Sequence, residues 1–155
     1  MLKQIQEGYV NSETHQGITT IEFYHPQSNS LPGKILEELA QEIHFAGTHK
    51  ETRVIVWKSA GEKTFCAGAS FDELLQIKTE AEGLKFFNGF ANVINAMRRC
   101  PKFIIARVQG KCVGGGVGLA AAADYCIAMV NSDVKLSELA IGIGPFVVAP
   151  AVERK

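Results

Sequence analysis

The feature of this sequence that most restricts its fold is a cluster of glycines between an apolar run and an alanine run. In the segment VQGKCVGGGVGLAAAADY (residues 108–125), the stretch from Gly110 to Gly118 holds five of the chain's fifteen glycines. Glycine weakens a helix by roughly 0.5–1 kcal/mol relative to alanine, so glycines at a helix start indicate positive φ or a close backbone approach. Such a junction also presents unpaired N–H groups and the positive end of a helix dipole, which favour an anionic oxygen.

The glycines alone leave two interpretations open. Small residues could let the helix pack tightly against a sheet, and the run Ala120 to Ala123 supports that structural reading. Alternatively, the helix N-terminus could bind an anion, which is a common property of such termini. The spacing GGGVG matches neither G-x-x-x-x-G-K-[ST] nor G-x-G-x-x-G. Phosphate-loop and dinucleotide-binding readings are therefore disfavoured.

A second small-residue loop favours the anion interpretation. The segment GEKTFCAGASFDEL (residues 61–74) also leads from an expected strand into an expected helix, with Gly68 and Ala69 at its turn. Two such loops can each supply one N–H to the same oxygen. Two converging N–H groups form an oxyanion hole, which stabilises the enolate or tetrahedral oxyanion of a thioester.

The apolar pattern predicts an α/β architecture in a single domain of residues 1–155, because strand-like runs alternate with amphipathic helices. We expect a hairpin or meander within the first 24 residues and then buried strands and helices in turn. The expected helices cover 31–47, 71–77, 84–97 and 119–123, and the expected strands cover 54–57, 103–108 and 126–130, the first of these buried on both faces.

Composition excludes several classes of function. Sixteen basic residues balance sixteen acidic ones, so no global charge favours nucleic acid or an anionic membrane as partner. No apolar run is long enough to span a membrane and the start lacks a secretion signal, so we expect a cytoplasmic protein. The spacing of the four cysteines fits neither a zinc site nor a disulfide framework, so we expect reduced thiols packed in the interior. The spacing of His44 and His49 also disfavours a metal site.

Together, KTFCAGASFDEL and ARVQGKCVGGGVGLAAAADYCIA resemble the two signature stretches of the crotonase (enoyl-CoA hydratase/isomerase) superfamily. The later SELAIGIGP resembles the third stretch of the family, and HPQSNSLPGKILEELAQEI resembles its first loop and helix. The resemblance covers nearly the whole chain. It implies a spiral of repeated β-β-α units that assembles as a homotrimer or a dimer of trimers.

The resemblance also implies that the chain binds an acyl-CoA, with no cofactor beyond the coenzyme A of the substrate. By motif position, the thioester oxygen would lie between the backbone amides of Ala69 and Gly115. Lys63 could meet a CoA phosphate, although a lone lysine is more often simply solvated. The further substrate-binding positions implied by the motifs are Phe65, Cys66, Ala67, Gly68, Gly114, Gly116 and Gly118.

The most informative departure from the family pattern concerns acid–base chemistry. Family hydratases carry two catalytic glutamates, and the first of these positions is here Gly118. The second is filled by Glu138, which without the motif would read as a surface glutamate beside Ser137. One carboxylate beside an oxyanion hole can remove a proton next to the thioester and return it further along the acyl chain. We therefore expect a Δ3,Δ2-enoyl-CoA isomerase, with enoyl-CoA hydratase as the alternative.

Two more departures concern the first loop and the length. Ser70 stands where the family commonly has aspartate, and we expect its hydroxyl to cap the next helix. The chain stops at Lys155, where family members continue, so we expect a C-terminal helical part to be missing. That keeps a third possibility open, a truncated chain that binds acyl-CoA without turnover. Asp124 is expected to fix a helix-to-strand turn, and nucleophilic roles for Cys66 and Cys112 are not expected.

Overall fold

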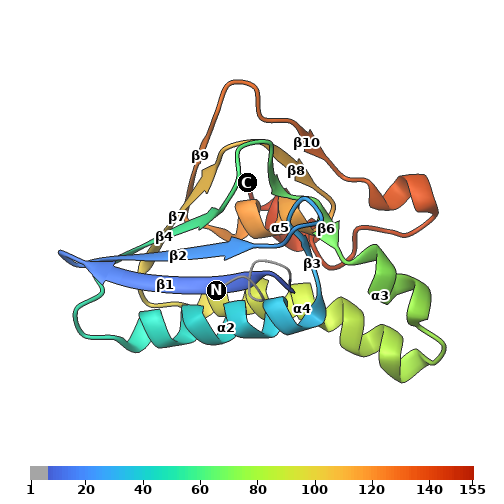
Figure 1. Ribbon diagram of the computed structural model, residues 1–155, viewed down its shortest axis with the longest axis horizontal. Helices are drawn as coiled ribbons and strands as arrows, with labels where there is room; N and C mark the ends of the chain where they lie inside the picture. Colours follow the sequence, from blue (N-terminus) through green and yellow to red (C-terminus); the bar gives the residue numbers. More distant parts are fainter. Residues whose placement is uncertain (1–6) are drawn as a thin grey trace.

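A computed structural model describes residues 7–155 and contains a five-stranded sheet with the order β1-β2-β4-β7-β9 (Figure 1). Only the first pair is antiparallel, and the remaining neighbours run parallel. Parallel neighbours need a crossover connection, and each of the three crossovers here contains a helix. The strands are β1 (Tyr9–His15), β2 (Ile18–Tyr24), β4 (Val54–Ser59), β7 (Phe103–Val108) and β9 (Tyr125–Ala128).

Two long helices, α2 (Gly33–Thr48) and α4 (Glu80–Arg99), lie side by side beneath β1 and β2 in Figure 1. Each is amphipathic and buries residues at helical spacing, as Leu36, Leu39 and Ile43 do in α2. Thr79 and Glu82 form a capping box at the start of α4, and two arginines lie in its last turn, where they complement the helix dipole. No helix in residues 7–155 is both long enough and apolar enough to cross a membrane.

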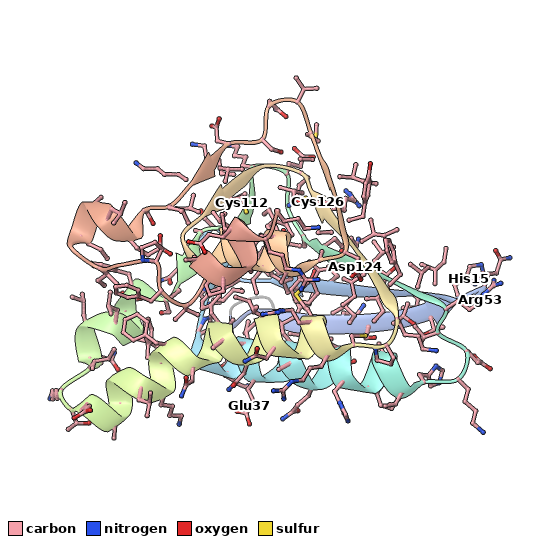
Figure 2. All side chains as sticks on the ribbon, turned by 180° about the vertical axis from the view of Figure 1, so that it is seen from behind. His15, Glu37, Arg53, Cys112, Asp124 and Cys126 are labelled. Atoms are coloured by element: carbon pink, nitrogen blue, oxygen red, sulfur yellow. The ribbon has the colours of Figure 1, made fainter. Side chains whose placement is uncertain are left out.

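The core lies between these helices and the sheet. Phe23 packs against Trp57 and Phe65, with ring centroids 5.3 and 5.5 Å apart, and all three side chains are fully buried. Figure 2 shows His15 and Arg53 at the outer tip of the β1–β2 hairpin, where Arg53 Nη2 donates to the Gln16 carbonyl at 2.8 Å. The hairpin tip thus lies outside the core.

Short elements complete the fold around the end of the sheet. A three-stranded parallel sheet has the order β10-β8-β5, and a two-stranded one pairs β3 with β6. Helix α5 runs back from the end of β8 and contacts α4 and α6 (Figure 1). The elements are β3 (Ser30–Leu31), β5 (Thr64–Cys66), β6 (Gly68–Ala69), α3 (Phe71–Gln76), β8 (Lys111–Val113), α5 (Gly115–Ala122), β10 (Val134–Lys135), the 3-10 helix η1 (Glu138–Ile141) and α6 (Ala149–Glu153).

The structure confirms the α/β class and the hairpin, and it corrects three local predictions. The first long helix begins at Gly33, because Pro32 is its extended N-cap and Leu31 pairs in β3. Strand β4 alternates between half-buried and buried residues, so it is not fully buried on both faces. The strand expected at 126–130 is β9, which runs from Tyr125 to Ala128 and has all four residues exposed.

Candidate functional site

Three short parallel strands bring the predicted site residues to one edge of the small sheet. Strand β8 lies between β5 and β10, and all three run in the same direction. The carboxyl ends of parallel strands meet at a common edge, where ligands bind in open α/β sheets. Here β5 leads to Gly68 and Ala69, β8 to Gly114 and Gly115, and β10 to Glu138.

A cavity of about 370 Å³ lies at this edge. Its volume falls within the ~300–1,000 Å³ typical of small-molecule sites. Three polar side chains contribute to its lining, those of Ser30, Ser137 and Glu138, and no lysine, arginine or histidine of the described residues does. The apolar side chains that line it are Ala67, Ala69, Phe71, Leu74, Phe86, Phe87, Phe90, Ala140, Ile141, Ile143, Pro145, Val147 and Val148.

The two glycine loops touch through their backbones. A Cβ at Gly68, where φ is +94°, would lie 3.2 Å from the Val113 carbonyl oxygen and 3.5 Å from the Gly115 nitrogen. A Cβ at Gly115 would overlap the ring of Phe90. Both loops therefore require glycine. The first needs it because of the positive φ of Gly68 and its close approach to the other loop, and the second because the Phe90 ring leaves no space for a Cβ at Gly115.

Each glycine loop contributes a backbone position to the cavity. Gly115 is the first residue of α5, so its N–H has no partner within the helix, and it donates to no other described residue. On the other loop, the Ser70 N–H donates to the Leu31 carbonyl at 3.1 Å. Both Ala69 and Gly115 line the cavity.

Glu138 approaches the glycine triplet from the third strand end. A Cβ at Gly114 would lie 3.2 Å from Ser137 Oγ and 3.6 Å from Glu138 Oε1. The other carboxylate oxygen, Glu138 Oε2, is buried and accepts no hydrogen bond from any described residue. A buried polar atom without a partner is costly, so such an atom in a cavity is a candidate to contact a ligand.

Gly118 lies beneath the cavity and does not line it. A Cβ at this position would come 2.5 Å from Val148 Cγ1 and 3.1 Å from Ile94 Cδ1. Both side chains are at least 95% buried. Gly118 stands where family hydratases carry their first glutamate. The space that a side chain would need there is filled by Ile94 of α4 and by Val148, the residue that precedes α6.

The structure divides the other predicted binding positions into two groups. Ala67, Gly68 and Gly114 line the cavity. Phe65 and Cys66 are fully buried in the core, so their side chains do not reach the cavity. Gly116 packs against Cys66 and does not line the cavity either. A ligand path along residues 65–68 therefore depends on Ala67 and Gly68. Lys63 is exposed at the start of this loop, apart from the cavity lining.

Three side chains behave as the sequence predicts. Ser70 caps α3, where its Oγ accepts from the Glu73 N–H at 3.3 Å. Asp124, labelled in Figure 2, follows α5, and its Oδ2 accepts from the Ile104 N–H at 2.8 Å. Burial raises the pKa of the Cys66 thiol to about 12, which disfavours a nucleophilic thiolate.

Sequence reasoning missed Ser30, Phe90 and Val148. Ser30 lies in a two-residue strand, and its Oγ donates to the Ala69 carbonyl at 2.9 Å. Phe90 and Val148 are buried and also line the cavity. Phe90 carries the helical apolar spacing of any core residue, and nothing in the sequence separates its position at the site from ordinary packing.

Comparison with known sequences gives a consistent family. A sequence model described as "Enoyl-CoA hydratase/isomerase" matches residues 13–155. The chain is 26% identical to an ethylmalonyl-CoA decarboxylase of Gallus gallus, over 93% of this chain and 49% of that protein. It is 29% identical to a (7aS)-7a-methyl-1,5-dioxo-2,3,5,6,7,7a-hexahydro-1H-indene-carboxyl-CoA hydrolase of Mycobacterium tuberculosis, over 81% of this chain and 51% of that protein.

Solved structures agree with the sequence comparisons. An enoyl-CoA hydratase from Bacillus anthracis superimposes with a TM-score of 0.81 and 28% identity, covering 90% of this chain and 54% of that one. The chain spans about half the length of the curated relatives that it matches. Both the crotonase fold and the family model cover most of this sequence. The chain therefore belongs to the enoyl-CoA hydratase/isomerase family of the crotonase superfamily.

Proposed function

We propose that this protein acts on an acyl-CoA thioester and moves a double bond from the 3,4 to the 2,3 position, with Glu138 as its single acid–base group. The observation that carries this proposal is the contrast between two neighbouring positions. Glu138 brings to the cavity a carboxylate oxygen that has no hydrogen-bond partner among residues 7–155, whereas Val148 and Ile94 fill the space beside Gly118. Only one of the two positions that the family uses for carboxylates can hold one here.

The proposed chemistry divides between backbone and side chain. The Ala69 and Gly115 amides would hold the thioester oxygen as it becomes an enolate oxygen, and the loss of one such donor typically costs about 2.7–4 kcal/mol. Glu138 would take a proton from C2 of a 3-enoyl-CoA and return it to C4, which leaves the 2-enoyl product. Water addition needs a further group to orient the water, and among the described residues the cavity lining offers only the polar side chains of Ser30 and Ser137 besides Glu138.

The lining also favours a neutral acyl group. A carboxylate moved into an apolar cavity is costly unless a cation pairs with it. The described lining contains no cationic side chain, and Glu138 would repel a second carboxylate. We therefore propose a hydrocarbon acyl chain rather than a carboxylated one.

The test is an assay of 3-enoyl-CoA isomerisation by the purified protein and its Glu138→Gln variant. We expect the parent to form 2-enoyl-CoA and the variant to lose roughly 10²–10⁴-fold in rate, the usual contribution of a positioned acid–base group. Binding of a saturated acyl-CoA should be nearly unchanged, because glutamine keeps the shape of the side chain. Full activity of the variant would exclude Glu138 as the base.

The same assay separates the alternatives. Formation of 3-hydroxyacyl-CoA from 2-enoyl-CoA would identify a hydratase, and binding without turnover by a folded sample would identify an acyl-CoA-binding protein.

Sedimentation of the same samples tests whether the protein forms the homotrimer that the family resemblance implies. Several large apolar side chains on and after β9, namely those of Tyr125, Ile127, Met129 and Val130, are exposed in one chain and could be covered by a second copy.

A further inference from the structure

A short segment beside the first glycine loop is fixed more firmly than its length suggests. Ser28 and Asn29 both have φ of +55°, a conformation that costs energy and persists only when the surroundings hold it. Asn29 is 3% exposed, and its Nδ2 donates to the carbonyls of Ala60 and Thr64 at 2.9 Å. Its Oδ1 accepts from the His25 N–H at 2.8 Å. The next residue, Ser30, therefore begins from a rigid backbone.

Ser30 connects this rigid segment to the loop that carries Ala69. Its backbone pairs with Gly68 in the β3–β6 ladder, and its Oγ donates to the Ala69 carbonyl oxygen at 2.9 Å. Ser30 also lines the cavity. Among the hydrogen bonds from side chains of residues 7–155, this is the one that reaches the carbonyl of Ala69.

We propose that Ser30 is a positioning residue for the oxyanion hole. Its hydroxyl holds the Ala69 carbonyl, which limits rotation of Ala69 and keeps the amide of the same residue aimed at the thioester oxygen. It also occupies a lone pair of a carbonyl whose partial negative charge would oppose the developing oxyanion. Donors aligned before the reaction stabilise the transition state without reorganisation. The inference rests on the proposed oxyanion hole.

The experiment compares the parent with Ser30→Ala and Ser30→Thr. The control is Ser132→Ala, which removes another serine hydroxyl donating to a backbone carbonyl, that of Val108, away from the cavity. Each protein is saturated with hexanoyl-CoA carrying ¹³C at the thioester carbonyl, and the carbonyl stretch is measured by difference infrared spectroscopy. A saturated acyl chain has no double bond to move or to hydrate, so the readout is the same whether the protein is an isomerase or a hydratase.

We expect the band of the bound thioester to lie below its solution frequency in the parent, the Ser132→Ala control and Ser30→Thr. In Ser30→Ala it should move back toward the solution value. The isomerisation kcat of Ser30→Ala should fall about fivefold to tenfold, the factor expected for one neutral hydrogen bond, with KM unchanged. Ser30→Thr should restore both, because threonine keeps the hydroxyl.

An unchanged carbonyl band in Ser30→Ala would overturn the role of Ser30 while leaving the oxyanion hole intact. The same conclusion would follow if Ser30→Thr behaved like Ser30→Ala, because the hydroxyl would then not matter. An unshifted band in the parent would overturn the oxyanion hole itself, and the proposed function with it. The positioning role would also be rejected if Ser30→Ala lost kcat with KM unchanged but kept the bound carbonyl band at the same frequency as in the parent.

Discussion

Placing a single methyl group at Gly118 tests whether a second side chain can be accommodated beneath the cavity. The new Cβ of Gly118→Ala would come within 2.5 Å of Val148 Cγ1, 2.7 Å of Val148 Cβ and 3.1 Å of Ile94 Cδ1. Ordinary van der Waals separations between carbon atoms are about 3.5–4.0 Å, so the overlap with Val148 is about 1 Å. Both neighbours are buried and cannot turn into solvent.

Overpacking of this kind costs typically about 1–3 kcal/mol. Because two Val148 atoms overlap the new methyl, we expect about 2 kcal/mol for Gly118→Ala, which for a chain of this size lowers the Tm by roughly 4–8 °C. Thermal unfolding followed by the fluorescence of Trp57, the one tryptophan of the chain, measures this change. Gly83→Ala is the matched control, since its Cβ would meet only Ile77 Cγ2 at 3.6 Å, and it should unfold at or slightly above the parent Tm.

A double-mutant cycle identifies the cause. Val148→Gly removes both overlapping atoms, whereas Val148→Ala would leave the Cβ at 2.7 Å. Gly118→Ala combined with Val148→Gly should therefore be more stable than the sum of the single changes predicts, by about 1 kcal/mol or more. If Gly118→Ala melts within 1 °C of the parent, the space at Gly118 is open. Val148 and Ile94 would then not exclude an acidic group from this space, and the steric part of the argument for a one-carboxylate site would fail.

Two other perturbations test the local structure around the site. Ser70→Ala should lower the free energy of unfolding by about 1 kcal/mol through loss of the α3 cap, measured by denaturant unfolding, and an unchanged midpoint would show that the cap is dispensable. Burial raises the pKa of the Cys66 and Cys112 thiols to about 12. A thiol in the unfolded chain releases its proton near pH 8.5, well below the pH at which these buried thiols do so. The free energy of unfolding should therefore fall as the pH rises from about 8.5 toward 12. Native-state labelling with a thiol reagent at pH 8 should modify exposed Cys126 first, and equally rapid labelling of Cys66 would contradict its burial.

The sequence predicted the long elements because their burial pattern is periodic. Residues 84–97 fall within α4, and the expected strand 103–108 is β7 with the same ends. The edges of the cavity were not predictable in the same way. Strands of two or three residues such as β3, β8 and β10 have no measurable alternation, and only their pairing partners define them.

The site residues also differ in whether the local sequence or a tertiary contact identifies them. Gly68, Ala69, Gly115 and Glu138 could be named in advance because glycine cost and motif resemblance single them out. Val148 could not, since its effect depends on the contact between the segment before α6 and α5, residues thirty positions apart in the sequence. Its influence on Gly118 is a tertiary effect that no local pattern encodes.

The segments that follow the three strands at the cavity differ in how many buried residues anchor them. The two glycine loops contain buried residues, including Gly68, Gly114 and Gly116, and pack against the core. By contrast, no residue from Asp124 to Val147 is buried, and β10 pairs with β8 over only two residues, Val134 and Lys135. Segments with few buried contacts open first in local unfolding. We therefore expect mild destabilisation to displace Glu138 before it disturbs the backbone amides of Ala69 and Gly115, so that the proposed proton transfer is lost while thioester binding persists.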